Sequence, residues 1–424
     1  MKNRFISLLL PFLLAGACSA DAATLTLQEC LDKADQSNPA LRSAAWDSRI
    51  AEENVRLAGA GHYPRIDAQA GYTMQLEPQA VKMGPVTAET QEPDFAFGGI
   101  SASYSIYDFG RRDARRSQAR SLADATASLF EARRKDLSLQ VIEAYFGILE
   151  AGHQAKAARE EVTQLEEHRR VAQALFEEGV VTRNDVLQAD VRLAAARQKL
   201  LAIENNRENG WLRLNYLTGS AAAFRGELNE QETINSDAGT TSSGTDALAR
   251  RPEIRALQQS IIASDAEVVE SRSNFFPELY TRLALDYVQN DKVREQAIMS
   301  ATVGLKVNLF DGFASTASRE KALRTKARNQ DTLRQTEAGI RLEIDTARND
   351  LRVAGARINV AESAIRQSEE NLRINNERYR ERVGTATEVL DAQTLLTQAK
   401  SDHYRALFDL QVAAARLKRA TGEL

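Results

Sequence analysis

The sequence holds few side chains whose types and spacing could perform catalysis. Its four histidines are scattered, and none stands at helical spacing from a second histidine or a cysteine, as a metal site would require. They are His62, His153, His168 and His403. A glycine-rich phosphate loop and a nucleophile elbow are both missing from the sequence. We therefore predict a protein that is not an enzyme and that needs no cofactor or metal.

The overall composition excludes several other classes of protein. Hydrophobic residues make up 43% and charged residues 27% of the 424 residues, which excludes a disordered chain. A mean hydropathy of -0.41 argues against a bundle of transmembrane helices. The 55 basic and 59 acidic residues give a net charge of -4, so nucleic acid is not expected as a partner.

The N-terminal segment predicts export from the cytoplasm. Two basic residues precede an apolar run that ends at Ala17, and small residues stand at Ala20 and Ala22, where a signal peptidase reads them. Residues 1–22 are therefore interpreted as a signal peptide. If cleavage follows Ala22, Cys30 is the one cysteine left, and no internal disulfide can form.

Cys18 opens an alternative to this interpretation. It ends the sequence Ala15-Gly16-Ala17-Cys18, which resembles a bacterial lipoprotein site except that Ala15 stands where leucine is usual. Lipidation at Cys18 is therefore the second interpretation of this segment.

The rest of the chain is a duplicated unit. Pro39 and Pro64 in the first half are separated by the same interval as Pro252 and Pro277 in the second. Further matches follow along both halves, which indicates an elongated repeat architecture. We predict a first repeat over residues 23–218, an irregular or equatorial linker rich in Gly, Ser and Thr over 219–246, and a second repeat over 247–424.

Each repeat contains two stretches in which apolar and polar residues alternate. These stretches, about 64–77, 95–109, 277–289 and 297–310, are typical of β-strands. Their length matches the roughly 9–11 residues that a tilted strand needs to cross a bilayer. Aromatic residues gather at one end of every strand, as in a membrane girdle: Tyr63, Tyr107, Phe109, Phe275, Phe276, Phe310 and Phe313. The alternative is a soluble sheet with half-buried strands, which shows the same alternation.

The remaining segments show helical periodicity. Two long helices are expected over about 111–178 and 314–382, and shorter ones over about 27–61, 183–217, 247–274 and 385–420. A helix of that length would extend roughly 100 Å, which no globular domain accommodates. The shorter helices in each half nearly add up to the long one, so two short helices can lie end to end beside it.

The strand count then requires several copies of the chain. Four strands leave two open edges, whose unpaired N–H and C=O groups cannot persist in lipid. Three copies would give a twelve-stranded barrel with a water-filled bore, whereas two would give a barrel filled by its own side chains. The polar residues expected inside favour the open version: Asp67, Gln75, Arg282, Asp286 and Lys306. The predicted fold class is an internally duplicated α+β membrane protein, with a long antiparallel α-helical coiled-coil barrel and a transmembrane β-barrel.

The stretch 378–393 and its counterpart 176–189 resemble the most recognisable segments of the outer-membrane efflux proteins, the TolC-like channels. This resemblance covers almost the whole chain after residue 22. It implies a homotrimer in the lipid of the Gram-negative outer membrane that extends into the periplasm. It also implies a passive exit duct for efflux or type I secretion, docked through a periplasmic adaptor (membrane fusion protein) to an inner-membrane pump. The sequence does not indicate the cargo.

The same resemblance implies a gate at the periplasmic end. By position, Tyr379 is similar to the gate tyrosine and Asp185 to its partner, while Glu388 and Asp391 match the carboxylate rings. The family's gate arginine has no clear equivalent here, although Arg382 or Arg183 could substitute for it, and the interval from Gly384 to Glu388 is two residues shorter than in the family's type member. Copies of Glu388 around a narrow bore would raise one another's pKa and attract cations. The alternative is that Glu388 and Asp391 are ordinary first-turn acids stabilised by the helix dipole.

A competing hypothesis is a structural or adhesive coiled-coil protein of the envelope without channel activity. It would account for the long helices. It would not account for four amphipathic strands with aromatic residues at one edge.

Overall fold

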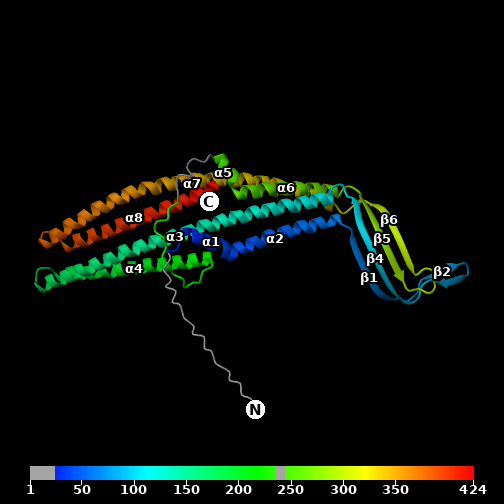
Figure 1. The fold of residues 1–424 in the computed structure, drawn as a ribbon, viewed down its shortest axis with the longest axis horizontal. Helices are drawn as coiled ribbons and strands as arrows, with labels where there is room; N and C mark the ends of the chain where they lie inside the picture. The colour runs from blue at the N-terminus through cyan, green and yellow to red at the C-terminus, as the bar shows by residue number, and fades with distance from the viewer. Residues whose placement is uncertain (1–23, 235–243) are drawn as a thin grey trace, which may run out of the picture.

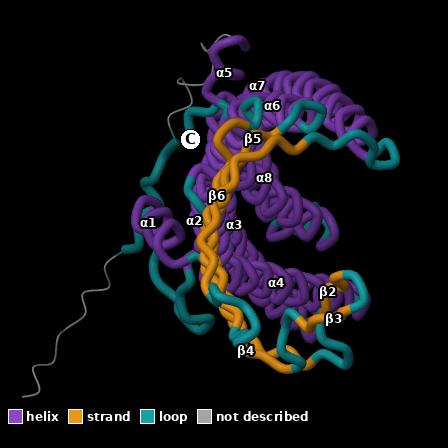
Figure 2. The backbone as a smooth tube through the Cα atoms, turned by 90° about the vertical axis from the view of Figure 1, so that its right-hand side faces the viewer, coloured by secondary structure: helices purple, strands orange, loops and turns teal. Residues whose placement is uncertain are grey.

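The computed structural model describes residues 24–234 and 244–424. The expected signal peptide and Cys18 lie outside the described residues, as does part of the expected linker. The molecule is elongated, with a sheet at one end and long helices over the rest of its length (Figure 1). Seen along its length, the helices and the sheet follow one open arc (Figure 2).

Four long strands form the main sheet. They are β1 (Arg65–Met74), β4 (Asp94–Tyr107), β5 (Glu278–Val288) and β6 (Ala297–Lys306), all antiparallel, in the order β1-β4-β5-β6. The two repeats therefore meet where β4 pairs with β5. Among the described strands, neither β1 nor β6 has a neighbour on its outer side.

The register places apolar side chains on one face of this sheet and polar ones on the other. Ile66 lies opposite Ala102, which lies opposite Leu283, and Leu283 lies opposite Ala301. The next residues along the strands form an equally continuous polar row, which consists of Arg65, Ser103, Arg282 and Thr302. The apolar face is uncovered in the single chain, since Met74 and Met299 are each 81% exposed.

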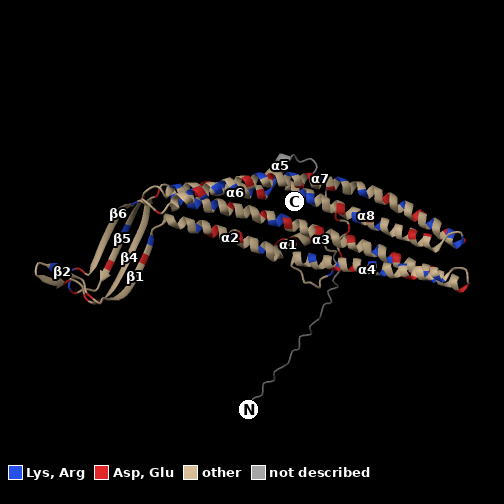
Figure 3. Ribbon diagram, turned by 180° about the vertical axis from the view of Figure 1, so that it is seen from behind, with Lys and Arg blue, Asp and Glu red and all other residues tan. Residues whose placement is uncertain are grey.

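A short hairpin between β1 and β4 was not expected from the sequence. Strands β2 (Ala80–Met83) and β3 (Val86–Glu89) pair with each other and form a separate two-stranded sheet. This hairpin lies beyond the end of the main sheet that is farthest from the helices (Figures 1 and 3). With four residues each, the two strands are too short for their alternation to stand out in the sequence.

The helices form two long hairpins. Helix α3 (Arg111–Glu177) turns back as α4 (Arg183–Thr218), and α7 (Ala314–Arg380) turns back as α8 (Ala386–Thr421). Helices α3 and α7 have 67 residues each, or about 100 Å at 1.5 Å per residue. In the described part of the chain, no helix has both the length and the apolar character needed to cross a membrane. Both signs of charge are distributed along the helices (Figure 3).

Short helices complete each repeat beside the long ones. They are α1 (Leu27–Ser37), α2 (Pro39–Gly59), η1 (Ala60–His62), α5 (Gly244–Arg250) and α6 (Pro252–Ser273). Where the sequence predicted one helix over about 27–61, the structure has a break at Asn38. The reason is local, because Asn38 adopts an extended ψ of 120° and Pro39 starts the next helix.

The largest hydrophobic cluster lies midway along the helices, near α1 and the segment 219–234. Trp211, Tyr145 and Phe146 are at most 2% exposed there and pack with leucines and isoleucines of α1, α3 and α4. The Tyr145 hydroxyl donates to the backbone carbonyl oxygen of Leu25 or Asn229, at 3.1 and 2.9 Å. Nearer the hairpin tips, small residues dominate the contacts between helices; Ala172 and Ala189, for example, are fully buried there.

Asn38 anchors the break between α1 and α2, and its removal should destabilise this central region. Its side-chain oxygen accepts from the N–H groups of Ala40 and Leu41, and its amide donates to the Leu217 carbonyl at 2.9 Å. We expect Asn38→Ala to lower the free energy of unfolding by about 2 kcal/mol, because the helix loses its cap and the buried Leu217 carbonyl loses its hydrogen-bond donor. Thermal unfolding measures this. The control Asn205→Ala, at an exposed position within α4, should be neutral or slightly stabilising.

Candidate functional site at the hairpin tips

The two hairpin tips lie together at the end of the molecule farthest from the sheet (Figure 1). Each long helix is followed, two residues after its end, by a residue with left-handed backbone: Gly179 with a φ of 74° in the first tip and Arg382 with a φ of 61° in the second. Glycine adopts this conformation freely, whereas arginine does so at a steric cost of roughly 1–2 kcal/mol. Arg382 is exposed and forms no ion pair with the described residues. It therefore presents a free cation at the tip.

Asp185 and Glu388 occupy equivalent positions in the two tips. Asp185 accepts from the Thr182 N–H at 2.9 Å, and Glu388 accepts from the Thr385 N–H at the same distance. Each threonine side chain completes a capping box with the third helical residue. Within one chain, both acids thus stabilise the starts of their helices.

The capping contact determines the pKa of Glu388 in the single chain. The Thr385 N–H lowers the pKa of this carboxyl, and Arg378, 3.6 Å from it, lowers it further. This direction is opposite to the rise expected from a ring of repelling copies. In a ring of copies, repulsion between the Glu388 carboxylates would therefore have to exceed the effects of the Thr385 N–H and Arg378 before the pKa of Glu388 rose.

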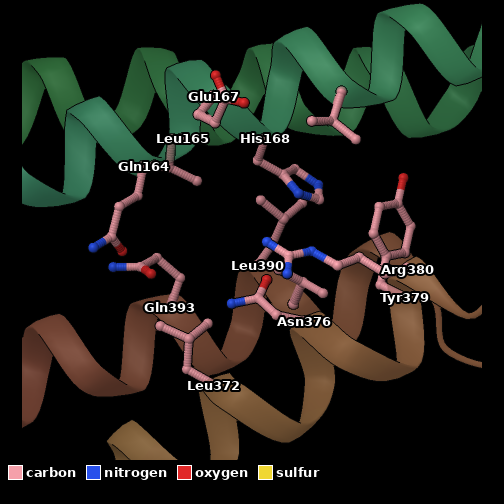
Figure 4. Close-up of a pocket in the computed structure, with 12 residues that line it drawn as sticks. Gln164, Leu165, Glu167, His168, Leu372, Asn376, Tyr379, Arg380, Leu390 and Gln393 are labelled. Atoms are coloured by element: carbon pink, nitrogen blue, oxygen red, sulfur yellow. The ribbon is translucent and has the colours of Figure 1, made fainter.

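Tyr379 lies on α7 and faces His168 on α3. The two rings are 5.4 Å apart between centroids at an angle of 42° (Figure 4). The Tyr379 hydroxyl is buried and finds no hydrogen-bond partner among the described residues. Burial raises the pKa of this hydroxyl, and the nearby negative charge of Asp185 raises it further. The structure thus brings Tyr379 close to Asp185 without a direct hydrogen bond between them.

A cavity of about 290 Å³ lies beside these rings, between α3, α7 and α8. Its polar lining includes Gln164, Arg380 and Gln393 as well as His168 and Tyr379 (Figure 4). The cavity is large enough for several water molecules, which could satisfy the unpaired hydroxyl. The cavity lies at the contact between the two hairpins, with α3 of the first hairpin on one side and α7 and α8 of the second on the other.

His168 was not recognised as a site residue from the sequence. Burial lowers the pKa of its imidazole, while the charge of Asp185 opposes that shift, and its Nε2 has no hydrogen-bond partner among the described residues. A signal for its position did exist. Leu165 and Ala172, three residues before and four after it, are 4% and 0% exposed, so the helical spacing places His168 on the buried face.

Asp391 lies outside this cavity and links the two hairpins. Its carboxylate accepts from Arg192 of α4 at 2.9 Å, and one turn earlier Thr387 donates to Gln188 at 2.9 Å. Of the predicted gate residues, Tyr379 and Asp185 therefore lie together, Glu388 caps α8, Asp391 bridges the hairpins and Arg382 stands at the tip.

The predicted aromatic girdle forms two groups at the junction between sheet and helices. Phe109 stacks on Phe276 at 4.9 Å and contacts Tyr107 at 4.8 Å, and Phe310 meets Phe313 edge to face at 5.5 Å. The remaining members, Tyr63 and Phe275, are 75% and 47% exposed. All seven rings therefore lie near one end of the sheet, with much of their surface uncovered in the single chain.

Comparison with known proteins identifies the family. The family described as outer membrane efflux protein matches residues 30–220 and 244–423. The chain belongs to this family. It is therefore a transport duct of the Gram-negative outer membrane, of the kind used in efflux and secretion systems, and not an enzyme.

Individual relatives agree with this assignment. The chain is 25% identical over 411 residues to protein CyaE of Bordetella pertussis, covering 94% of this chain and 84% of CyaE. It is 23% identical over 420 residues to the alkaline protease secretion protein AprF of Pseudomonas aeruginosa, covering 95% and 86%. The solved structure of the outer-membrane channel OprN has the same fold, with a TM-score of 0.84 at 20% identity over 94% of this chain and 90% of OprN.

If Tyr379 and Asp185 hold the duct closed, removing both groups should open it. We expect Tyr379→Phe combined with Asp185→Ala to increase single-channel conductance in planar lipid bilayers. Thr182→Ala is the matched control, because it breaks the same capping box and leaves the Asp185 carboxylate in place. Unchanged conductance in the double variant, or an equal increase in the control, would remove the two residues from the gate.

The buried imidazole of His168 should make the tip sensitive to acid. A histidine with a lowered folded pKa favours the folded packing above its ordinary pKa of about 6.5, and this contribution is lost as the pH falls from there. The charge of Asp185 of α4 acts on the imidazole, and Arg380 of α7 and Glu167 of α3 line the same cavity. Conductance should rise between about pH 7 and pH 5.5 in the wild type.

In His168→Leu this rise should be absent, because the side chain no longer titrates. His62→Leu is the control, since His62 ends η1 directly before β1, at the sheet end of the helices, where it contacts Asp113. An identical pH profile in wild type and His168→Leu would refute the role of His168.

Proposed function

We propose that three copies of the chain form one continuous duct, with a twelve-stranded barrel in the outer membrane and a helical barrel in the periplasm. The observation that supports this most directly is the main sheet, which is apolar on one face, polar on the other and open at both edges. Pairing β6 of one copy with β1 of the next closes every edge. The apolar face then meets lipid, and the polar face lines the bore.

The helical part extends this bore toward the periplasm. Helices α3 and α7 each extend about 100 Å from the junction, and the α4 and α8 hairpin arms lie beside their distal halves. We propose that a periplasmic adaptor binds the tips and that an inner-membrane pump delivers the cargo. The relative AprF is named for secretion of alkaline protease, which supports protein cargo as one option for this duct.

We further propose that the tips form the closed gate. Tyr379, Asp185 and His168 would pack the two hairpins of one copy together, and Glu388, Asp391 and Arg382 would face neighbouring copies around the axis. Their exposure in the single chain supports this arrangement, since Arg382 and Asp391 are exposed and Glu388 is partly exposed. We retain the proposed division of the chain into a signal peptide over 1–22, repeats over 23–218 and 247–424, and an equatorial segment between them.

The orientation of the sheet can be tested with two neighbouring positions on β1. Ala68 lies on the apolar face and Gln69 on the polar face, and both are exposed in the single chain. An arginine at a lipid-facing position costs about 2–4 kcal/mol near the bilayer centre, whereas one facing water in the bore costs little. Ala68→Arg should therefore abolish the outer-membrane trimer, and Gln69→Arg should preserve it.

The measurement is the amount of SDS-resistant oligomer, before and after boiling, in the outer-membrane fraction, together with its mass. The wild type should run as three copies until boiled. Equal behaviour of the two arginine variants would contradict the proposed orientation. A wild-type protein found as a monomer in the periplasm would favour the structural coiled-coil hypothesis instead.

A further inference from the structure

Two glycines on the polar face of the sheet each lie beneath an aromatic ring of the adjacent strand. Gly71 of β1 is paired with Phe97 of β4, and a Cβ atom built on Gly71 would lie 2.6 Å from Phe97 Cζ. Gly304 of β6 is paired with Tyr280 of β5, and its Cβ would lie 2.7 Å from both Cζ and the hydroxyl oxygen of Tyr280. Real carbon atoms do not approach this closely, so each ring occupies the space that a side chain would fill.

This geometry shows how the rings lie on the wall. A Cβ atom in a strand projects from the face of the sheet, so a ring whose tip occupies that place leans across the neighbouring strand and covers its backbone. A third glycine on the polar face, Gly99, is covered by a carboxylate instead of a ring, since its Cβ would lie 2.7 Å from Asp286 Oδ1. Within the main sheet the close approach is confined to this face. Gly98 lies on the apolar face, and its nearest neighbour would be the Gln69 carbonyl oxygen at 3.6 Å, an ordinary contact.

The two rings mark opposite ends of the barrel wall. Gly71 stands near the end of β1 that is remote from the helices, and Tyr280 stands near the start of β5 next to them. Between these levels the polar face carries the charges of Asp67, Arg282 and Asp286. Tyr280 also lines a hollow of about 620 Å³, which is within the range of small-molecule sites.

We propose that Phe97 and Tyr280 form two aromatic contact surfaces for planar aromatic cations passing through the bore, and that Gly71 and Gly304 let these rings lean against the wall instead of projecting into the bore. This inference rests on the proposed trimeric duct, in which the polar face lines the bore. Each copy contributes one ring at each level. A π-face attracts both aromatic rings and cations, and the carboxylate of Asp286 adds attraction for positive charge, whereas Asp67 is already paired with Arg65 at 3.0 Å.

A ring over a glycine also supports the sheet itself, so the test must separate transport from stability. Gly71→Ala places a methyl group where the Phe97 ring lies, and the ring must move off the wall into the bore. Gly304→Ala likewise places a methyl group where the Tyr280 ring lies, and that ring must also move into the bore. We expect each variant to form SDS-resistant oligomers and to lose single-channel conductance in planar bilayers.

Removing the displaced ring should restore the open bore. Gly71→Ala combined with Phe97→Ala should conduct at least as well as the wild type, although it lacks both native partners. Gly98→Ala is the matched control on the opposite face and should leave conductance unchanged. Wild-type conductance in Gly71→Ala, or continued loss of conductance in the double variant, would overturn the positioning role of Gly71.

The contact role requires a probe of defined chemistry. Ethidium, a planar aromatic cation, should interrupt the current through the wild type, and Phe97→Leu and Tyr280→Leu should shorten these interruptions. Interruptions of the current by tetraethylammonium, a cation without a ring, should shorten less in the same two leucine variants. Tyr72→Leu, on the apolar face of β1, is the control and should behave as the wild type.

The outcomes separate this inference from the proposed function. Ethidium interruptions of equal length in wild type and both leucine variants would refute the contact role, while the duct itself would stand. A wild-type protein that forms no channel would refute the proposed duct before either ring is tested.

Discussion

The requirement that every backbone N–H and C=O group in lipid finds a partner governs the whole architecture. In the single chain, β1 and β6 each leave one row of these groups unpaired, and water cannot satisfy them inside a bilayer. Closure by further copies removes both edges at once. Closure also explains why apolar and polar residues alternate on the four strands, because it turns the apolar face toward lipid and the polar face toward a common bore. The duplicated sequence supplies two hairpins of matching length for this purpose.

Packing energy is distributed unevenly along the helices, and this has consequences for motion. The large buried side chains, among them Trp211 and Tyr145, gather midway along the molecule. Toward the tips the buried residues are mainly alanines with single leucines such as Leu165 and Leu390, and a cavity separates the hairpins. Regions with fewer buried apolar contacts open at lower free-energy cost. Opening the tips should therefore cost less free energy than opening the central cluster.

The two repeats share a fold but differ at the positions where a gate would act. Gly179 and Arg382 hold the same left-handed backbone, yet only the second presents a cation there. Asp185 and Glu388 cap equivalent helices, but only Asp185 acts on the Tyr379 and His168 pair. Duplication thus provided two equivalent tips, and substitutions at single positions made them unequal. In the proposed gate, this asymmetry would let one hairpin lock against the other within each copy.

The sequence by itself determined the features that depend on local periodicity and chain length. Strand alternation, the 67-residue helices and the placement of aromatic residues such as Phe109 at the strand ends all follow from spacing along the chain. The break at Asn38 and the β2–β3 hairpin were missed, because a capped helix break and four-residue strands leave little periodic signal. Only the tertiary structure decided the contacts between distant segments: His168 against Tyr379, Asp391 on Arg192, and Phe97 over Gly71. These depend on helix rotation and strand register, which no single segment specifies.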